Sequence, residues 1–243
     1  MSKSFILIIE TTTDICSVAL AQVSETKITA SETKITATAE ATNAHASNLT
    51  LLIAEVLQKQ GIMAQQLYAV AVSDGPGSYT GLRIGAATAK GICYASGAHL
   101  IAADTLRGIA EMEKNRFDYS DKKTLFCPMI DARRMEVYTA IYDLNGVALT
   151  PIQAVIIDTD FENVFLRSHN IEGYDQIVFC GNGAEKCTEI LKINAHFLVR
   201  PSVSTAAGLL PDILQKIDNQ KFVDIAYYEP NYLKGANITK SVT

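Results

Sequence analysis

Short apolar runs recur in the first hundred positions of the chain. They cover residues 5–9, 15–23, 68–72 and 100–103, and polar or glycine-rich segments separate them. Runs of this length with little polar alternation are typical of buried strands. The polar segment ETTTD (10–14) joins the first two runs, so this part of the sequence predicts a hairpin.

A helical period replaces this pattern between residues 45 and 60. Apolar side chains recur there three and four positions apart, which predicts an amphipathic helix that Gly61 ends. His45 extends the same stripe by one turn toward the N-terminus. The stripe consists of Leu49, Leu52, Ile53, Val56 and Leu57.

The glycine-rich segment SDGPGSYTGLRIGAATAKG (73–91) directly follows the third apolar run. It predicts a tight turn at residues 75–77 and a helix that begins near Ser78 or Thr80 and ends at Gly97. Its glycine spacing differs from that of a Walker A loop, a dinucleotide fingerprint and a nucleophile elbow. The segment therefore encodes no phosphate loop or nucleophile of these types.

One face of this predicted helix is almost bare backbone, because Gly81, Gly85 and Ala89 recur every four residues. Glycine inside a helix costs about 1 kcal/mol relative to alanine, so the spacing indicates a packing requirement. Two interpretations are open at this point. The bare face packs against the chain's own sheet, or it docks a helix of another chain.

The heptapeptide SETKITA occurs twice in tandem, at residues 24–30 and 31–37. Its threonine and isoleucine content favours strand. Because side chains alternate along a strand, Ile28 and Ile35 in one continuous strand would face opposite sides. We therefore expect a bulge or a turn between the copies, within an extended hairpin that has no chemical role.

The second half of the chain repeats the alternation of strands and helices and predicts a second unit that begins near Asp104. Asp104 is the expected cap of a helix over residues 105–113. Strands are predicted at residues 125–130, 136–142 and 177–180, hairpin turns at 131–135 (DARRM) and 144–146, and helices after GNGAEK (181–186) and over 204–217. Residues 224–234 form a final returning segment. This order of elements predicts an α/β protein with mixed sheets.

Composition predicts a soluble globular chain. Of its 243 residues, 48% are hydrophobic and 19% are charged, and the net charge of −5 gives no overall electrostatic footprint for nucleic acid. The N-terminal apolar run is too short for a signal peptide or a membrane span, so we expect a cytoplasmic protein with no membrane contact. The five cysteines include no C-x-x-C pair, which predicts reduced thiols in the core.

Few segments carry an obvious catalytic motif. No two of the four histidines lie four positions apart, so no H-x-x-x-H metal site is predicted, and His45 is interpreted as a helix-end or interface residue. The ETTTD and GNG segments offer donors to a phosphate, and Arg133 with Arg134 is either an anion clamp or an ordinary surface pair. Four carboxylates lie near glycines in the sequence: Glu10, Asp14, Asp74 and Asp131. They would hold magnesium only if the fold brings them close together.

Several segments together resemble the bacterial TsaB (YeaZ) family: IETTTDICSVAL, NAHASNLTLLIAEVL, SDGPGSYTGLRIGAATAKGI, IAADTL, DARRMEVY, GNGA and PNYLK. The resemblance runs almost from end to end, and GPGSYTGLRIG (75–85) is its most specific part. It implies an α/β actin-like ATPase fold (ASKHA, ribonuclease H-like) with two subdomains. Residues 1–103 plus 222–243 would form the N-terminal, partner-docking subdomain, and residues 104–221 the C-terminal one.

The resemblance also implies a function. Members are non-catalytic partners of the TsaD enzyme, which transfers a threonylcarbamoyl group from its adenylate to the adenosine next to the tRNA anticodon, and a TsaE ATPase completes the assembly. TsaD carries an H-x-E-G-H metal motif after the strand that corresponds to residues 100–103, where this chain reads DTLRG without histidine. No metal is therefore expected here. ATP and the metal would belong to partner subunits, and tRNA would be bound through the complex.

The resemblance further implies a docking face. In the family, the two N-terminal helices pack against the matching helices of TsaD, or of a second copy in a homodimer when TsaD is absent. This favours the docking interpretation of the bare glycine face. Carried over to this sequence, the partner-binding residues are His45, Leu49, Leu52, Val56, Gly81, Arg83, Gly85 and Ala89.

A vestigial phosphate or nucleotide site is the last expectation. It would consist of Glu10, Thr11, Thr12, Thr13, Gly181 and Gly183. Glu10 stands where actin-like ATPases have aspartate, and the extra methylene displaces its carboxylate from magnesium geometry. Nucleotide binding by the isolated chain is left open. The alternatives to a partner subunit are an actin-fold ATP-dependent kinase, a metallopeptidase acting on its own, and a self-assembling module without a link to tRNA.

Overall fold

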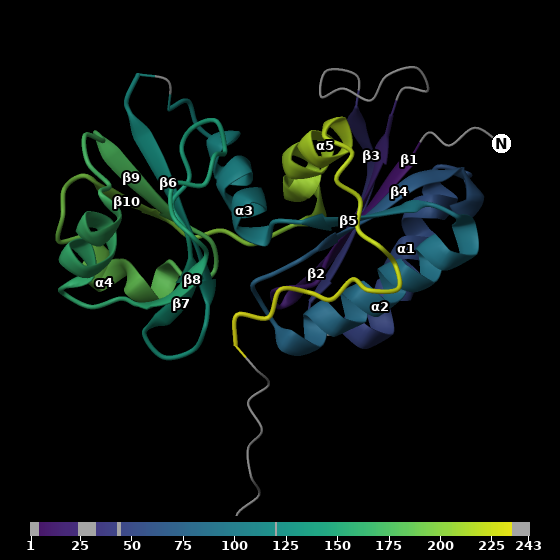
Figure 1. Ribbon diagram of the computed structural model, residues 1–243, viewed down its shortest axis with the longest axis horizontal. Coiled ribbons are helices and arrows are strands. Elements are labelled where there is room, and N and C mark those ends of the chain that lie inside the picture. Colours follow the sequence, from purple (N-terminus) through teal and green to yellow (C-terminus); the bar gives the residue numbers. More distant parts are fainter. Residues whose placement is uncertain (1–4, 24–32, 43–44, 120, 235–243) are drawn as a thin grey trace, which may run out of the picture.

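The computed structural model describes residues 5–23, 33–42, 45–119 and 121–234. Two five-stranded mixed sheets lie side by side, each with helices on its faces (Figure 1). The predicted α/β class and the division into two subdomains follow from this arrangement. We refer to the sheet built from the N-terminal strands as the first sheet.

The apolar runs at the N-terminus form the centre of the first sheet. β1 pairs antiparallel with β2 and parallel with β4, as the hairpin and the helical crossover require. In spatial order the sheet contains β3 (Lys34–Thr42), β2 (Ile15–Gln22), β1 (Phe5–Glu10), β4 (Leu67–Ser73) and β5 (His99–Ala103). A short 3₁₀ turn, η1 (Ala64–Gln66), precedes β4.

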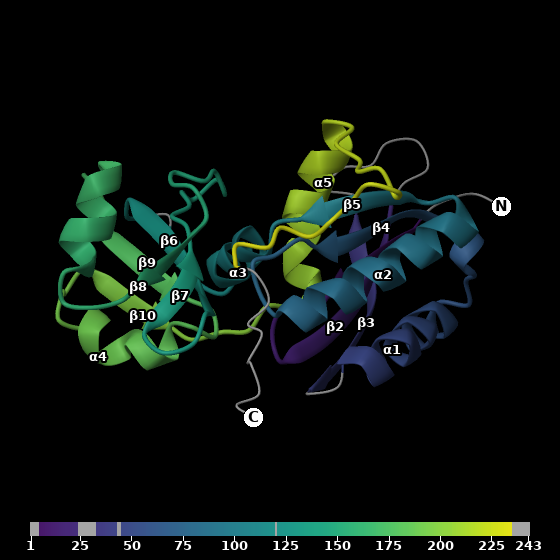
Figure 2. The ribbon, with the colours of Figure 1, turned by 60° about the horizontal axis from the view of Figure 1, so that its bottom comes forward.

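Helices cover both faces of the first sheet (Figure 2). α1 (His45–Lys59) and α2 (Tyr79–Ser96) lie side by side on one face and share a core with it. η5 (Ala206–Leu209) and α5 (Leu210–Asp218) pack on the other face. Because both faces are covered, the inner strands are apolar without alternation.

The ends of α2 agree with the sequence prediction. Ser78 is the N-cap, and its hydroxyl accepts the backbone N–H of Gly81 at 3.2 Å. Gly97 ends the helix with a left-handed φ of 66°, a conformation that glycine adopts without strain.

The second sheet contains, in spatial order, β10 (Phe197–Arg200), β9 (Gln176–Cys180), β6 (Thr124–Asp131), β7 (Glu136–Thr139) and β8 (Gln153–Ile156). α3 (Thr105–Lys114) packs on one face. Short helical segments cover the other: η2 (Glu162–Leu166), η3 (Arg167–His169), η4 (Glu185–Cys187) and α4 (Thr188–Leu191). The strands β8 and β10 and the turn η2 were not predicted from the sequence.

Three predicted elements differ from the observed ones. The strand expected over 136–142 stops at Thr139, because its next residue would pair with Pro128, which has no N–H for the ladder. The helix expected over 204–217 begins with the 3₁₀ turn η5 at Ala206, because Thr205 has an extended backbone, and becomes α-helical at Leu210. The segment after GNG forms only a 3₁₀ turn and the single turn α4.

Asp104 joins the two subdomains at the start of α3. Its carboxylate accepts the backbone N–H of Arg107 at 3.1 Å, which confirms the predicted cap, and the hydroxyl of Tyr142 at 2.8 Å. Asp212 on α5 accepts the N–H of Asp104 at 2.9 Å and a guanidinium N–H of Arg107 at 3.0 Å. These bonds hold α3 of one subdomain against α5 of the other.

The boundary between the subdomains differs from the predicted one at its C-terminal end. η5 and α5 pack against the first sheet through Leu209, Ile213 and Ile217, so the chain returns to the first subdomain by residue 206 and not at residue 222. Residues 222–234 then form an extended segment across this subdomain, coloured yellow in Figure 1, which we call the C-terminal strap. The strap ends at the second subdomain, where Lys234 forms an ion pair with Glu136.

Two smaller predictions have different outcomes. All five cysteines are buried free thiols, as expected. The first SETKITA copy lies outside the described residues, and the second enters β3 at Lys34. The junction of the two copies, where a bulge or a turn is expected, lies outside the described residues. Within the second copy, Thr36 is skipped in the pairing of β3 with β2, and its hydroxyl donates to the Leu20 carbonyl.

Candidate functional site

The turn between β1 and β2 is organised around the buried carboxylate of Glu10. One carboxylate oxygen accepts the N–H and the hydroxyl of Thr12, both at 2.5 Å, and the other accepts the Ser204 hydroxyl at 2.9 Å. Burial raises the pKa of Glu10, and these hydrogen bonds counteract the rise. The oxygens that would face a magnesium ion are therefore bonded within the chain.

The glycine-rich segment packs directly on this turn. The Thr11 hydroxyl donates to the Gly81 carbonyl at 2.8 Å, and the N–H of Ser78 donates to the Thr12 carbonyl at 2.7 Å. A Cβ on Gly85 would lie 2.5 Å from the Thr11 hydroxyl oxygen, and one on Gly77 would lie 2.6 Å from the Thr12 carbonyl oxygen. The glycines thus allow α2 and its preceding loop to approach the β1–β2 turn.

This packing bears on the predicted phosphate site. The N–H of Thr11 donates to the Ser73 hydroxyl and the N–H of Thr12 to Glu10, while both hydroxyls are also engaged inside the chain. In phosphate-binding turns such donors point at the ligand. The arrangement at Thr11 and Thr12 supports the turn itself and leaves these donors no free hydrogen.

The second half of the predicted phosphate site, at Gly181 and Gly183, is packed in a similar way. The N–H of Gly183 donates to the Met129 carbonyl at 2.9 Å, and that of Gly181 donates to the Ser202 hydroxyl at 2.9 Å. Gly181 has a φ of 95°, and a Cβ there would collide with the Met129 carbonyl. The segment that carries Ser202 also carries Ser204, so one stretch of chain contacts both halves of the predicted site.

The predicted docking residues require a correction. Leu49, Leu52 and Val56 are buried in the core that α1 shares with the first sheet. Gly81, Gly85 and Ala89 are the buried side of α2. The bare glycine face is therefore an internal packing face. This agrees with the interpretation that it packs within the chain and not against a helix of another chain. Of the predicted set, Arg83 is exposed, and the side chain of His45 lies outside the described part of the chain.

The opposite sides of the same two helices are exposed and carry few charges. We call this surface the outer helix face and define it by Leu51 and Ala54 on α1 and by Ala87, Gly91 and Tyr94 on α2. The side chain of Leu51 is 67% exposed and that of Tyr94 is 87% exposed. The helices lie side by side, so their outward sides form one surface (Figure 2). The available sequence signal was that Ala87 and Gly91, on the side of α2 opposite Gly85 and Ala89, are also small.

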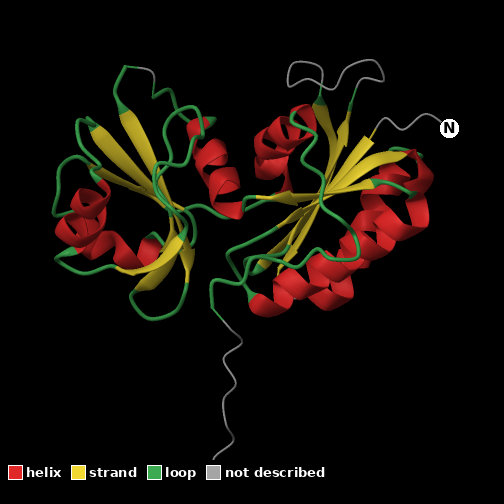
Figure 3. Cartoon of the chain, in the orientation of Figure 1, coloured by secondary structure: helices red, strands yellow, loops and turns green. Residues whose placement is uncertain are grey.

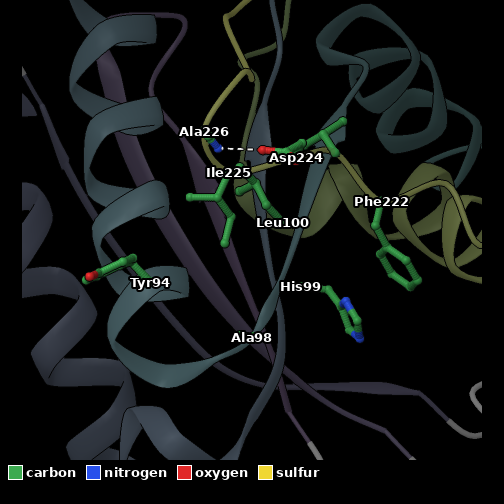
Figure 4. Close-up of a pocket in the computed structure, with 9 residues that line it drawn as sticks. Tyr94, Ala98, His99, Leu100, Phe222, Asp224, Ile225 and Ala226 are labelled. Atoms are coloured by element: carbon green, nitrogen blue, oxygen red, sulfur yellow. Dashed lines mark hydrogen bonds between the residues drawn. The ribbon is translucent and has the colours of Figure 1, made fainter.

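A groove of about 470 Å³ lies at the C-terminal end of this surface. Tyr94 and the stacked rings of His99 and Phe222 lie at its two ends, with Leu100 and Ile225 between them (Figure 4). The groove is mostly apolar. A carboxylate at its edge, Asp224, accepts the N–H of Ala226 at 2.7 Å. The groove holds no arrangement of acid, base and nucleophile.

Among the described residues, no group of three or more histidine, cysteine, aspartate or glutamate side chains could hold a metal ion. Within the same residues, no helix has the length and apolar character needed to span a bilayer. Figure 3 shows that every helix lies against one of the two sheets.

The two sheets, their crossover helices and the two glycine turns at the junction define an α/β protein of the actin-like (ASKHA) fold. A solved structure described as YeaZ from Pseudomonas aeruginosa superimposes with a TM-score of 0.76, covering 95% of this chain and 100% of that one at 22% sequence identity. This likeness supports the fold.

Sequence comparison identifies the family. The family model described as TsaD, tRNA N6-adenosine threonylcarbamoyltransferase, matches residues 27–238, so the chain belongs to this family, and within it to the TsaB (YeaZ) proteins. The TsaB protein of Escherichia coli, described as a tRNA threonylcarbamoyladenosine biosynthesis protein, is 28% identical over 94% of both chains. The Haemophilus influenzae protein of the same description is 32% identical over 57% of this chain and 53% of its own.

Proposed function

We propose that the chain is the non-catalytic partner of a TsaD-type enzyme in the complex that adds threonylcarbamoyl to adenosine next to the anticodon of tRNAs. The observation that carries this proposal is the match over almost the whole chain to proteins described as acting in tRNA threonylcarbamoyladenosine biosynthesis. The internal bonding of Glu10, Thr11 and Thr12 supports it, because a kinase of this fold needs the threonine donors for phosphate and the carboxylate for magnesium.

The outer helix face is the docking surface in this proposal. Leu51 and Tyr94 are large exposed apolar side chains, and the small residues Ala54, Ala87 and Gly91 between them allow a partner helix to approach closely. A TsaD-type subunit shares the family of this chain, so its matching helices provide an apolar face of similar shape. A second copy of this chain occupies the same face when the TsaD-type subunit is absent.

The other components of the complex follow from this role. A TsaE-type ATPase binds the assembled pair, and ATP and the metal are held by the partner subunits. The complex works in the cytoplasm, where its tRNA substrate is found. This chain then shows no turnover alone, and tRNA modification by the partners requires it.

Substitutions of matched exposure test the docking surface. Leu51→Glu places a charge on the outer helix face, and Val164→Glu does so at an equally exposed site in the second subdomain, since both side chains are 67% exposed. A fully buried leucine contributes about 1.5–3 kcal/mol, so Leu51→Glu is expected to weaken the complex at least about tenfold. Val164→Glu is expected to leave the affinity unchanged. Titration calorimetry with the purified TsaD-type subunit of the same organism gives both values.

Reconstitution of tRNA modification tests the role itself. The TsaD-type and TsaE-type subunits, the adenylate-forming enzyme and tRNA are combined with and without this chain. Full modification in its absence would reject the proposal. Equal affinities of the Leu51→Glu and Val164→Glu variants would reject only the docking surface.

A further inference from the structure

Three tyrosines from distant parts of the sequence surround one shallow hollow at the junction of the two subdomains. Tyr79 begins α2, Tyr138 lies in β7, and Tyr232 lies in the C-terminal strap. The rings of Tyr79 and Tyr232 contact each other, with their centroids 4.9 Å apart. The hollow itself has a free volume of about 10 Å³, so a planar ligand would lie across the rings and not inside it.

Positive charge gathers around these rings. The guanidinium of Arg83 lies over the ring of Tyr79, 4.9 Å from its centroid. Lys234 lines the hollow. Burial raises the pKa of Tyr138, the charge of Lys234 lowers it, the charge of Glu136 raises it, and the charge of Arg133 lowers it. Arg133 and Arg134 are exposed in the turn between β6 and β7, which borders Tyr138.

The neighbouring carboxylates are already neutralised. Glu136 forms an ion pair with Lys234, and Asp131 forms one with Lys186 at 2.5 Å. Among the ion pairs found in the described residues, none involves Arg83, Arg133 or Arg134. The surface therefore carries a local excess of positive charge on a chain whose net charge is −5.

The two arginines of the turn occupy backbone positions that favour glycine or asparagine. Arg133 has a φ of 73° and Arg134 a φ of 51°. Arginine is strained in this region of backbone space, so local turn preference does not account for either residue. Both arginines are exposed in the short turn between β6 and β7. Guanidinium groups match the geometry of phosphate oxygens.

We propose that this hairpin-tip surface, formed by Arg133, Arg134, Tyr138, Tyr79 and Tyr232, binds unpaired nucleotides of the tRNA substrate. The arginines contact backbone phosphates, and a base that has left its stack lies against the accessible parts of the half-buried tyrosine rings. Sequence-specific RNA recognition targets unpaired nucleotides. Their bases stack on aromatic side chains, and neighbouring basic side chains bind the phosphates. This inference rests on the proposed function, because it assigns part of the tRNA contact to this chain.

A double substitution with a matched control tests the phosphate contacts. Arg133→Gly with Arg134→Gly removes both guanidinium groups and relaxes the left-handed backbone, so the turn is expected to fold at least as well. Lys122→Ala with Lys123→Ala removes the same charge at the opposite end of β6, where both residues are exposed. Each variant is assembled with the TsaD-type subunit, and the affinity for a full-length tRNA transcript is measured from 50 to 200 mM salt.

The arginine variant is expected to bind tRNA about tenfold more weakly at the middle of this range. Its plot of log affinity against log salt is expected to flatten by about 1.5 to 2, the change expected for two lost phosphate contacts. The lysine variant is expected to match the wild type. For the stacking contact, Tyr138→Ala is expected to lose about tenfold while Tyr138→Phe retains the affinity, since phenylalanine keeps the ring.

The outcomes separate this inference from the proposed function. Wild-type affinity and slope for the arginine variant would overturn the inference and leave the partner role intact. If the arginine variant no longer bound the TsaD-type subunit, the hairpin-tip surface would be a protein interface, and this result would also overturn the inference. Modification of tRNA without this chain would refute the partner role, and the inference with it.

Discussion

Gly85 and Gly91 lie in the same helix, α2, yet the structure predicts opposite effects for the same substitution. A Cβ on Gly85 would lie 2.5 Å from the Thr11 hydroxyl oxygen and 3.2 Å from a methyl group of Val72. A Cβ on Gly91 would have no neighbour within 4 Å apart from its chain neighbours and the backbone of its own helix. Alanine at either position improves helix propensity by about 1 kcal/mol.

At Gly85 that gain is outweighed. Overpacking in a filled core costs about 1–3 kcal/mol. Displacing the Thr11 hydroxyl also weakens its buried bond to the Gly81 carbonyl, and leaving such a group unpaired costs about 1–3 kcal/mol. The net expectation for Gly85→Ala is a loss of about 2 kcal/mol of unfolding free energy. For Gly91→Ala it is a gain of about 0.5–1 kcal/mol.

Urea denaturation of the two variants beside the wild type measures both values. In a thermal scan, 1 kcal/mol corresponds to about 2–4 °C for a domain of 150–250 residues, so the two midpoints should lie on opposite sides of the wild-type value. An increase of stability in Gly85→Ala similar to that in Gly91→Ala would refute the close approach of α2 to the β1–β2 turn. Circular dichroism at low temperature checks that both variants keep the native helix content.

Two further predictions concern the same region. Gly77→Ala is expected to destabilise the fold by about 3 kcal/mol, more than Gly85→Ala, because its Cβ meets backbone atoms of Thr12 that cannot rotate away, and denaturation measures this. Burial raises the pKa of Asp74 from 3.8 to about 6, against the hydrogen bond from Tyr228, so the folded state retains the proton more strongly than the unfolded one. The contribution of the protonated Asp74 carboxyl to the unfolding free energy is therefore fully present below about pH 4 and is lost as the pH rises through about 6. Asp74→Asn should flatten this part of the stability profile, and an unchanged profile would contradict the raised pKa.

Much of the first subdomain is predictable from the sequence because its signals are local. Continuous apolar runs mark β1, β2, β4 and β5, and Ser78 and Gly97 mark the ends of α2 by cap chemistry within a few residues. The second subdomain is less predictable. The short strands β8 and β10 have weak periodicity, and the end of β7 depends on a proline in its neighbour β6.

The candidate site shows a similar division. The resemblance of the segments quoted from the sequence establishes the family, and the match over residues 27–238 confirms it. Six of the predicted docking residues lie on the buried side of their helices: Leu49, Leu52, Val56, Gly81, Gly85 and Ala89. The stripe of Leu49, Leu52 and Val56 is the amphipathic signal of a buried face, and family knowledge of docking helices does not say which side is turned outward.

The sequence alone determined the α/β class, the caps of α2 and α3, the buried thiols and the family. Only the tertiary structure decided that the glycines of α2 face Thr11 and Thr12, and that Leu51 and Tyr94 remain exposed. The physical reason is distance along the chain. Periodicity reports that a helix has two unlike sides, but the element that covers one of them lies about seventy residues away, as in the bond between Thr11 and Gly81. Such contacts exist only once the chain has folded.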